Sequence, residues 1–256
     1  MAVVAGVGRL TPPVDVDGPR VRLGLLWAAV TFVAVAAGPL TTSLVFAVVA
    51  LGAAGQACRT WRRSGHRPFV PVAAGGAALA ALAGCVSPLA VVAAVVLIAV
   101  TGLAAAQLRP GGTAWDVRVT LAIGISIGVA AASPAIVRNG LGALPALVLV
   151  ALVHAVDASA FIVGSGARSR WEGPVAGLAS AGAVGLAVAA TMAPPFRGAS
   201  PWILAGVIAV AVPAGGVMAT ALLGRDEAPV PALRRLDAYL LAGPAWALLA
   251  TILLDA

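Results

Sequence analysis

Long stretches of apolar residues without any charge constrain the fold of this chain more than any other feature. The stretch Gly24–Ala57 would be about 51 Å long as a single α-helix, and the stretch Phe69–Leu108 would be about 60 Å long. A helix crosses the hydrocarbon core of a membrane, which is roughly 30 Å thick, with about 20 residues. Each stretch is therefore too long for one crossing, and the breaks at Gly38-Pro39 and Ser87-Pro88 predict two helices in each.

Five further apolar stretches follow in the second half of the chain. They are Val119–Ala135, Leu141–Gly164, Pro174–Pro194, Pro201–Leu223 and Leu236–Leu254. With 61% hydrophobic and 10% charged residues, a soluble domain of 256 residues could not cover its surface with polar groups. The sequence therefore predicts an all-α, polytopic integral membrane protein with about nine transmembrane helices. We expect a cytoplasmic N-terminal segment over residues 1–23 and a single transmembrane domain over residues 24–256.

The distribution of arginine predicts how the chain is oriented in the membrane. All 16 basic residues are arginines, and they lie in or beside the short segments between the apolar stretches. If the N-terminus is cytoplasmic, 14 of them fall at the cytoplasmic side and only Arg138 and Arg197 fall outside, which agrees with the positive-inside rule. We expect a multi-pass protein of the cell inner (plasma) membrane. Because the net charge of +7 belongs to these loops, we expect no nucleic-acid partner.

Asp157, in the segment VHAVDASAFIVG, is the one acid that lies well inside an apolar stretch. The predicted orientation puts it in the cytoplasmic half of the membrane, where a buried carboxylate costs on the order of 3 kcal/mol. That cost favours a functional role for Asp157 over a role in packing. His154 precedes Asp157 by about one helical turn on the same face, and a local packing role is the favoured interpretation for this histidine.

A charged segment, GARSRWEGP, separates two apolar stretches at the predicted cytoplasmic side. Pro174 suits the first turn of the next helix, whose N-terminal N–H groups would face the cytoplasm. Together with Arg168 and Arg170, this helix terminus predicts contact with a phosphate. The alternative is a structural role, with the arginines as positive-inside anchors and Trp171 in the interfacial belt.

Further acids fall on the same side of the membrane. Asp237 opens the last apolar stretch, where an acid also offsets the dipole of a helix. Asp157, Glu172 and Asp237 belong to three different predicted helices, and carboxylate oxygens of this kind hold Mg²⁺. We therefore predict a Mg²⁺ site formed by these three acids. We also expect Asp157 to face the protein interior, within reach of Asp237 or Arg235, across a polar pocket that opens to the cytoplasm.

Two blocks of the sequence resemble the CDP-diacylglycerol synthases, which are also called phosphatidate cytidylyltransferases. The segments DASAFIVG and RWEGPVAG look like the aspartate-containing and Thr-Trp-Glu-Gly blocks of that family, and RRLDAYLLAGP is similar to its closing signature. The segment RTWRRSGHRP also resembles the second cytoplasmic loop of the family. The resemblance is collinear from about residue 20 to the end, and it implies a polytopic fold of nine helices.

The resemblance implies a reaction at the cytoplasmic face, in which a phosphate oxygen of phosphatidic acid attacks the α-phosphorus of CTP and pyrophosphate leaves. It implies that Asp157 and Asp237 are catalytic and hold Mg²⁺, with Glu172 as a further metal ligand. The residues assigned to substrate binding are Arg168, Arg170, Trp171, Glu172 and Arg235. The expected partners are CTP and a membrane lipid similar to phosphatidic acid, with a homodimer as one option.

The chain departs from the family pattern at several expected acids. Gly215-Gly216 stand where the family has Gly-Asp in its penultimate helix, and Arg234 replaces the first Asp of the closing signature. Either Glu172 or one of the loop acids Asp226 and Glu227 would have to supply the missing oxygen ligands.

Two functions are therefore open. The first is a divergent phosphatidate cytidylyltransferase that acts on phosphatidic acid or a related lipid phosphate. The second is a catalytically inactive relative that binds a lipid phosphate, a nucleotide or a partner membrane protein. Three or more carboxylates around one pocket would favour the enzyme, whereas Asp157 alone would favour the binding protein. A small transporter is less favoured, because the sequence shows no evident internal repeat.

Overall fold

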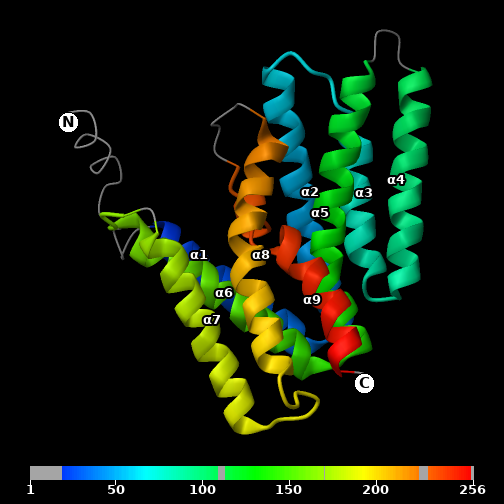
Figure 1. Ribbon diagram of the computed structural model, residues 1–256. Coiled ribbons are helices and arrows are strands. Elements are labelled where there is room, and N and C mark those ends of the chain that lie inside the picture. Colours follow the sequence, from blue (N-terminus) through cyan, green and yellow to red (C-terminus); the bar gives the residue numbers. More distant parts are fainter. Residues whose placement is uncertain (1–18, 109–112, 170, 225–229, 255–256) are drawn as a thin grey trace, which may run out of the picture.

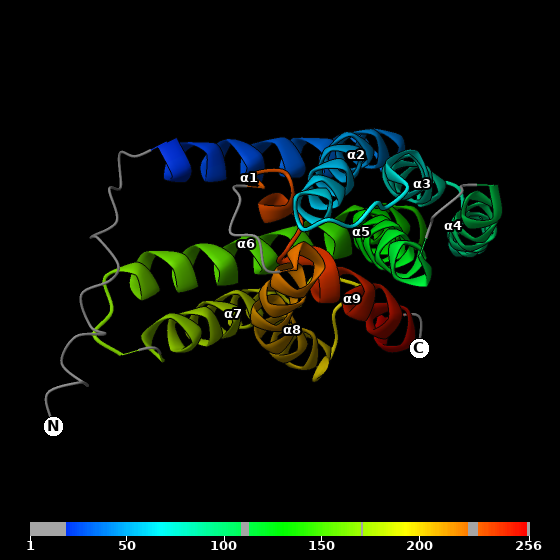
Figure 2. The ribbon, with the colours of Figure 1, turned by 90° about the horizontal axis from the view of Figure 1, so that it is seen from above.

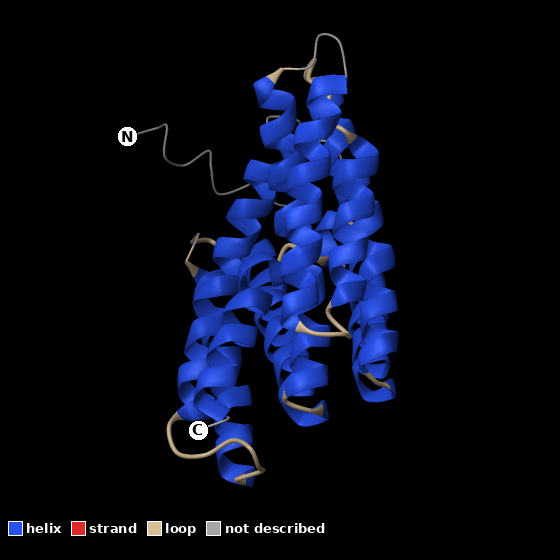
Figure 3. Cartoon of the chain, turned by 90° about the vertical axis from the view of Figure 1, so that its right-hand side faces the viewer, coloured by secondary structure: helices blue, strands red, loops and turns tan. Residues whose placement is uncertain are grey.

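The structure is a computed structural model that describes residues 19–108, 113–169, 171–224 and 230–254. These residues form nine α-helices and one short 3-10 helix, with no strand among them (Figure 1, Figure 3). The elements are α1 (Pro19–Ala37), α2 (Pro39–Arg63), α3 (Val70–Ala83), α4 (Pro88–Leu108), α5 (Ala114–Gly140), α6 (Ala143–Ser165), α7 (Glu172–Thr191), α8 (Ser200–Leu223), η2 (Leu233–Arg235) and α9 (Tyr239–Leu254). The predicted all-α fold class is confirmed.

Seven helical segments are long and apolar enough to cross a membrane. They are α2, α4, α5, α6, α7, α8 and the segment Leu233–Leu254, which contains α9. The apolar parts of α1 and α3 are shorter, and the 14 residues of α3 would span only about 21 Å. The structure is therefore that of a multi-pass membrane protein, and the expected count of nine crossings is not confirmed within the described residues.

Prolines set the start of two helices at the predicted breaks. α2 begins at Pro39 and α4 begins at Pro88, because the first helical position needs no backbone N–H donor. Gly38, between α1 and α2, has a φ angle of 135°, which a residue with a side chain rarely adopts. The two long uncharged stretches are therefore divided where the sequence predicts.

Two other helix starts differ from the sequence prediction. α5 begins at Ala114 rather than Val119, because Thr113 and Asp116 form a capping box that extends the helix beyond its apolar part. The last helix begins at Tyr239, because the 3-10 turn η2 comes before it. In both cases hydrogen bonds outside the apolar stretch determine the boundary.

The helices form two groups that α8 and α9 connect. α2, α3 and α5 pack on one another, and α4 lies against α3 and α5. α6 and α7 form a pair that runs obliquely beside α8, and α1 lies along α6 (Figure 1, Figure 2). α9 packs on both α5 and α8. α9 also contacts α6, and Asp237, just before α9, lies against Gly215 of α8.

An aromatic contact fixes the start of α9. The ring of Tyr239 is fully buried and lies 5.3 Å from the ring of Phe46 in α2, centroid to centroid. Phe46 in turn lies 5.5 Å from Trp27 in α1. Both pairs have edge-to-face geometry, which aromatic rings prefer. This contact ties α1, α2 and α9 together and holds the residues just before Tyr239 in place.

Candidate functional site

A cavity of about 260 Å³ lies where α6, α7, α8 and the start of α9 meet. Its lining residues are Val156, Asp157, Ala160, Gly164, Ser169, Gly173, Pro174, Gly177, Ala209, Val212, Pro213, Gly216, Asp237 and Ala238. Asp157 and Asp237 are the two charged residues in this lining. The two acids that the sequence predicts to be catalytic therefore come together, although 80 positions separate them in the chain.

Asp157 projects into the cavity from α6. Its carboxylate is exposed rather than packed, and it has no hydrogen bond or ion pair with any residue that the structure describes. Arg235 and Arg234 act on it electrostatically without direct contact. Asp157 therefore lines the same cavity as Asp237, but it is exposed rather than buried in the protein interior, and most of the other lining residues are apolar.

Asp237 reaches the same cavity from the turn that precedes α9. One carboxylate oxygen, Oδ1, accepts a hydrogen bond of 2.7 Å from the backbone N–H of Ala238. The negative charges of Asp157 and Asp237 act on each other. Two like charges in one partly enclosed space repel, and a bound cation removes that repulsion.

Close backbone packing brings the walls of the cavity together. A Cβ atom at Gly173 in α7 would lie 2.9 Å from the carbonyl oxygen of Ala160 in α6, which is too close for a real side chain. A Cβ atom at Gly215 in α8 would collide with the carbonyl oxygen of Asp237. These two glycines therefore let α7 approach α6 and let α8 approach the start of α9.

The two arginines at the start of α9 flank the cavity without belonging to its lining. Arg235 is half-buried, and its Nη1 lies 3.9 Å from the position of a Cβ atom at Gly24 in α1. Its charge acts on both His154 and Asp157 of α6. Arg234 is exposed. The predicted substrate-binding residue Arg235 therefore lies between α1 and α6, beside the acids.

The loop between α6 and α7 holds the remaining predicted residues. The backbone N–H of Ser169 donates a hydrogen bond of 2.9 Å to Oε1 of Glu172, which closes the loop onto the start of α7. Ser169 lines the cavity, whereas Arg168, Trp171 and Glu172 are exposed and lie outside the lining. Arg170 lies outside the described residues. The structure therefore does not bring Glu172 together with the two aspartates.

Two carboxylates, rather than the three expected, meet at the cavity. Within the described ranges, no three side chains of His, Cys, Asp or Glu gather closely enough to hold a metal ion by themselves. Glu172 is engaged in its own loop, and Asp226 and Glu227 lie outside the described residues. A cation at this site would therefore need oxygen ligands beyond the described carboxylates.

His154 forms a polar contact that the sequence pattern did not reveal. Its Nε2 lies 2.9 Å from Oγ1 of Thr31 in α1 and 3.4 Å from the hydroxyl of Tyr239 in α9. The partners lie 123 and 85 positions away in the chain, so sequence spacing carries no signal of these contacts. The arrangement gives His154 a packing role between α1, α6 and α9, next to the cavity.

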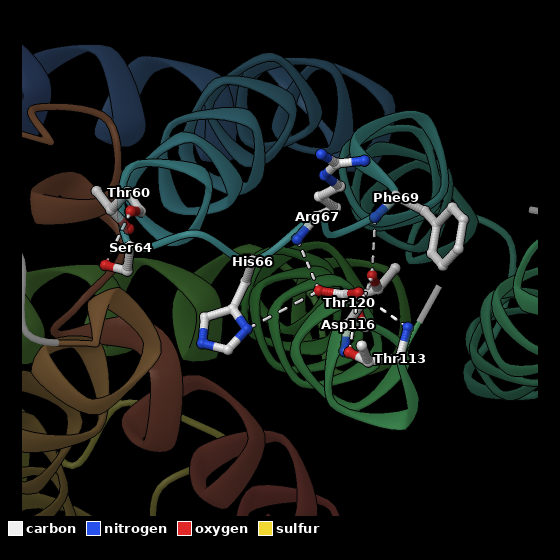
Figure 4. A network of polar contacts seen from close by, with 8 residues as sticks. All are labelled: Thr60, Ser64, His66, Arg67, Phe69, Thr113, Asp116 and Thr120. Carbon is white, nitrogen blue, oxygen red and sulfur yellow. Dashed lines mark hydrogen bonds and ion pairs between the residues drawn. The ribbon is translucent and has the colours of Figure 1, made fainter. Parts of the chain in front are cut away.

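A second polar network, around Asp116, joins the loop after α2 to the start of α5 (Figure 4). Oδ1 of Asp116 accepts a hydrogen bond of 2.6 Å from the backbone N–H of Arg67, and Oδ2 accepts bonds from the backbone and hydroxyl of Thr113. Nδ1 of His66 lies 4.0 Å from Oδ1 of Asp116. The hydroxyl of Thr120 accepts a further bond from the N–H of Phe69. The Asp116 oxygens and the Thr120 hydroxyl already accept hydrogen bonds from the loops that precede α3 and α5. We therefore assign this network a structural role.

No protein-family model, curated protein or solved structure matches the chain. The site is therefore characterised by its own geometry, which combines a cavity between apolar helices, two carboxylates in its lining and two arginines that act on them electrostatically.

Proposed function

We propose that this protein is a divergent relative of the CDP-diacylglycerol synthases, which transfers CMP from CTP to phosphatidic acid or a related lipid phosphate. One observation carries the proposal. Asp157 and Asp237 belong to the two separate sequence blocks that resemble the family, and they line one cavity. Each carboxylate in a membrane helix costs free energy, so two acids that share one cavity favour a functional role over a purely structural one.

The charges at the cavity fit a divalent cation and a phosphate. Mg²⁺ is commonly held by one or two protein carboxylates together with the phosphates of its substrate and water. Asp157 and Asp237 match that donor set, because Asp157 forms no hydrogen bond or ion pair with a described residue and the charges of the two acids repel each other. When bound there, Mg²⁺ would neutralise the phosphates and orient them for attack.

The arginines supply the positive charge that the reaction needs beside the acids. An oxygen of the lipid phosphate forms a bond to the α-phosphorus of CTP, and the bond from that phosphorus to the pyrophosphate oxygen breaks. The leaving pyrophosphate carries away the electron pair, so it needs cationic groups nearby. Arg235 lies beside Asp157 and His154, and we assign it to this role together with the exposed Arg168.

The size of the cavity suits a lipid headgroup. Its volume of about 260 Å³ leaves room for a phosphate and its glycerol. Apolar residues such as Val156, Ala160 and Val212 line the rest of the wall. We propose that the acyl chains stay in the bilayer and that CTP reaches the site from the cytoplasm.

One feature favours a second candidate function, which is binding without turnover. Only two carboxylates of the described residues line the cavity, and Arg234 stands in place of an acid of the family's closing signature. An arginine cannot serve as a metal ligand, and its charge could hold a lipid phosphate directly. The protein would then bind the same headgroup without transferring CMP.

A turnover assay decides between these functions. The purified protein, in nanodiscs that contain phosphatidic acid, is incubated with Mg²⁺ and CTP labelled at the α-phosphorus. The proposed function predicts labelled CDP-diacylglycerol in the lipid fraction and an equal amount of pyrophosphate. Binding of phosphatidic acid without either product supports the second candidate, and the absence of both binding and products refutes both.

A further inference from the structure

Pro213 lies inside α8 and changes the backbone hydrogen bonds of that helix. Proline has no N–H group, so the carbonyl four residues earlier loses its usual helical partner. In α8 that carbonyl belongs to Ala209. No side chain in the described part of the chain donates a hydrogen bond to it. Pro213 therefore deprives the carbonyl of Ala209 of its usual helical donor.

Ala209 and Pro213 both line the cavity to which Asp157 and Asp237 also belong. Ala209, Pro213 and Gly216 are three or four positions apart, which puts them on one face of α8, and all three line the cavity. Their side chains carry no polar atom. On this wall, polar atoms can come only from the backbone, and the carbonyl of Ala209 is the one whose usual helical donor Pro213 removes.

We propose that the carbonyl of Ala209 is the third protein oxygen of this site and that it holds a divalent cation together with Asp157 and Asp237. The inference rests on the proposed function, because it specifies how the cavity binds the cation. It also accounts for a site that has only two carboxylates among the described residues. Backbone carbonyls freed at helix interruptions coordinate cations at other membrane sites, where they line a polar cavity.

Two other helices offer matched controls. Pro134 lies inside α5 and Pro244 lies inside α9, and neither belongs to the lining of the cavity. Pro134 frees the carbonyl of Ala130, which is covered by the close approach of Gly243, whose Cβ position lies 3.3 Å away. Replacing either proline restores the same kind of helical hydrogen bond without altering the proposed cation site.

The test measures binding of Mn²⁺ alone, by electron paramagnetic resonance, to the full chain in nanodiscs, with Mg²⁺ as competitor. Pro213→Ala and Pro213→Gly both restore an N–H at position 213, so both should raise the Kd for Mn²⁺ about tenfold, as expected for the loss of one contact to a charged ligand. Pro244→Ala should leave the Kd unchanged. Without metal, Pro213→Ala should melt no lower than the natural protein, because a helical hydrogen bond is gained.

Two outcomes would overturn the inference. The first leaves the proposed function intact, and the second refutes the metal-dependent reaction as well. If Asp157→Asn weakens Mn²⁺ binding while both Pro213 variants bind as tightly as the natural protein, the Ala209 carbonyl is not a ligand and the proposed function stands. If the natural protein binds no Mn²⁺ at all, the cation site fails together with the metal-dependent reaction.

Discussion

Asp157 carries a charge that the surrounding protein does not neutralise by direct contact. Its nearest cationic influence comes from Arg234 and Arg235, and it forms no hydrogen bond with a described residue. A carboxylate inside a membrane helix persists more readily when a cation shares its site. A cation bound in the cavity would supply the direct neutralising contact that no described residue makes with Asp157.

Neutralising either aspartate should abolish CMP transfer. We expect Asp157→Asn and Asp237→Asn each to lower kcat by at least about 100-fold, since each removes charge that stabilises the reacting phosphates. Glu172→Gln should lower kcat by less than about tenfold, because Glu172 closes a loop and lies outside the cavity. Initial rates of CDP-diacylglycerol formation measure all three. Equal losses in the three variants would contradict the assignment of Asp157 and Asp237 as a pair.

Restoring an acid on the α8 wall should strengthen cation binding. Gly216 lines the cavity at the position where the resembling family has Asp, and a Cβ atom there would meet nothing within 4 Å. Gly216→Asp should therefore lower the Kd for Mn²⁺ on the order of tenfold, because a third carboxylate adds charge to the site. Gly216→Asn is the matched control without charge. Weaker Mn²⁺ binding in Gly216→Asp than in Gly216→Asn would argue against a cation in this cavity.

The elements show how far the sequence determines the fold. The breaks at Gly38-Pro39 and Ser87-Pro88 are local, and they divide the helices as predicted. The early start of α5 depends on a capping box whose Asp116 also binds the loop after α2, 49 positions away. The sequence predicts that Asp157, Glu172 and Asp237 share a site because all three fall on the same predicted side of the membrane. In the structure the two aspartates line one cavity, whereas Glu172 accepts a hydrogen bond within its own loop and lies outside the lining. Local backbone chemistry is readable in a sequence, whereas contacts between distant helices are not.

The Asp116 network should stabilise the junction of α2, α3 and α5. Asp116→Ala removes the acceptor for the N–H groups of Arg67 and Thr113, so the free energy of unfolding should fall by about 2 kcal/mol. Asp116→Asn keeps one oxygen acceptor and should lose less. Denaturant titration in mixed micelles measures both variants, and CMP transfer per folded molecule should stay unchanged. If Asp116→Ala had the same free energy of unfolding as the natural protein, the proposed structural role of the Asp116 network would be wrong.

For the whole molecule, the number of helices that cross the membrane determines whether the cavity opens to the cytoplasm or to the outside. We propose nine crossings with a cytoplasmic N-terminus, in which α1 and α3 cross as shorter helices. The arginines support this orientation, because only Arg138 and Arg197 would lie outside. If α3 to α7 all cross, five crossings separate the end of α2 from the start of α8, which places these two points on opposite sides of the membrane.

Cysteine labelling in intact cells tests this topology. Ser64, after α2, and Ala199, before α8, are both exposed. The end of α2 and the start of α8 lie at opposite ends of the bundle (Figure 1). In a background in which the natural cysteines are replaced, a membrane-impermeant maleimide should label Ala199→Cys and should label Ser64→Cys only after the membrane is permeabilised. Labelling of both positions from the same side would rule out the proposed topology.

We propose that Asp157 and Asp237 hold one cation in the cavity between α6, α7, α8 and the start of α9. An experimental structure of the protein in nanodiscs with Mg²⁺, phosphatidic acid and a non-hydrolysable CTP analogue tests this directly. We expect a metal ion at about 2.1 Å from an oxygen of each aspartate, in contact with phosphate. A structure in which Asp157 points at lipid, with the nucleotide or the lipid phosphate bound elsewhere, would contradict it.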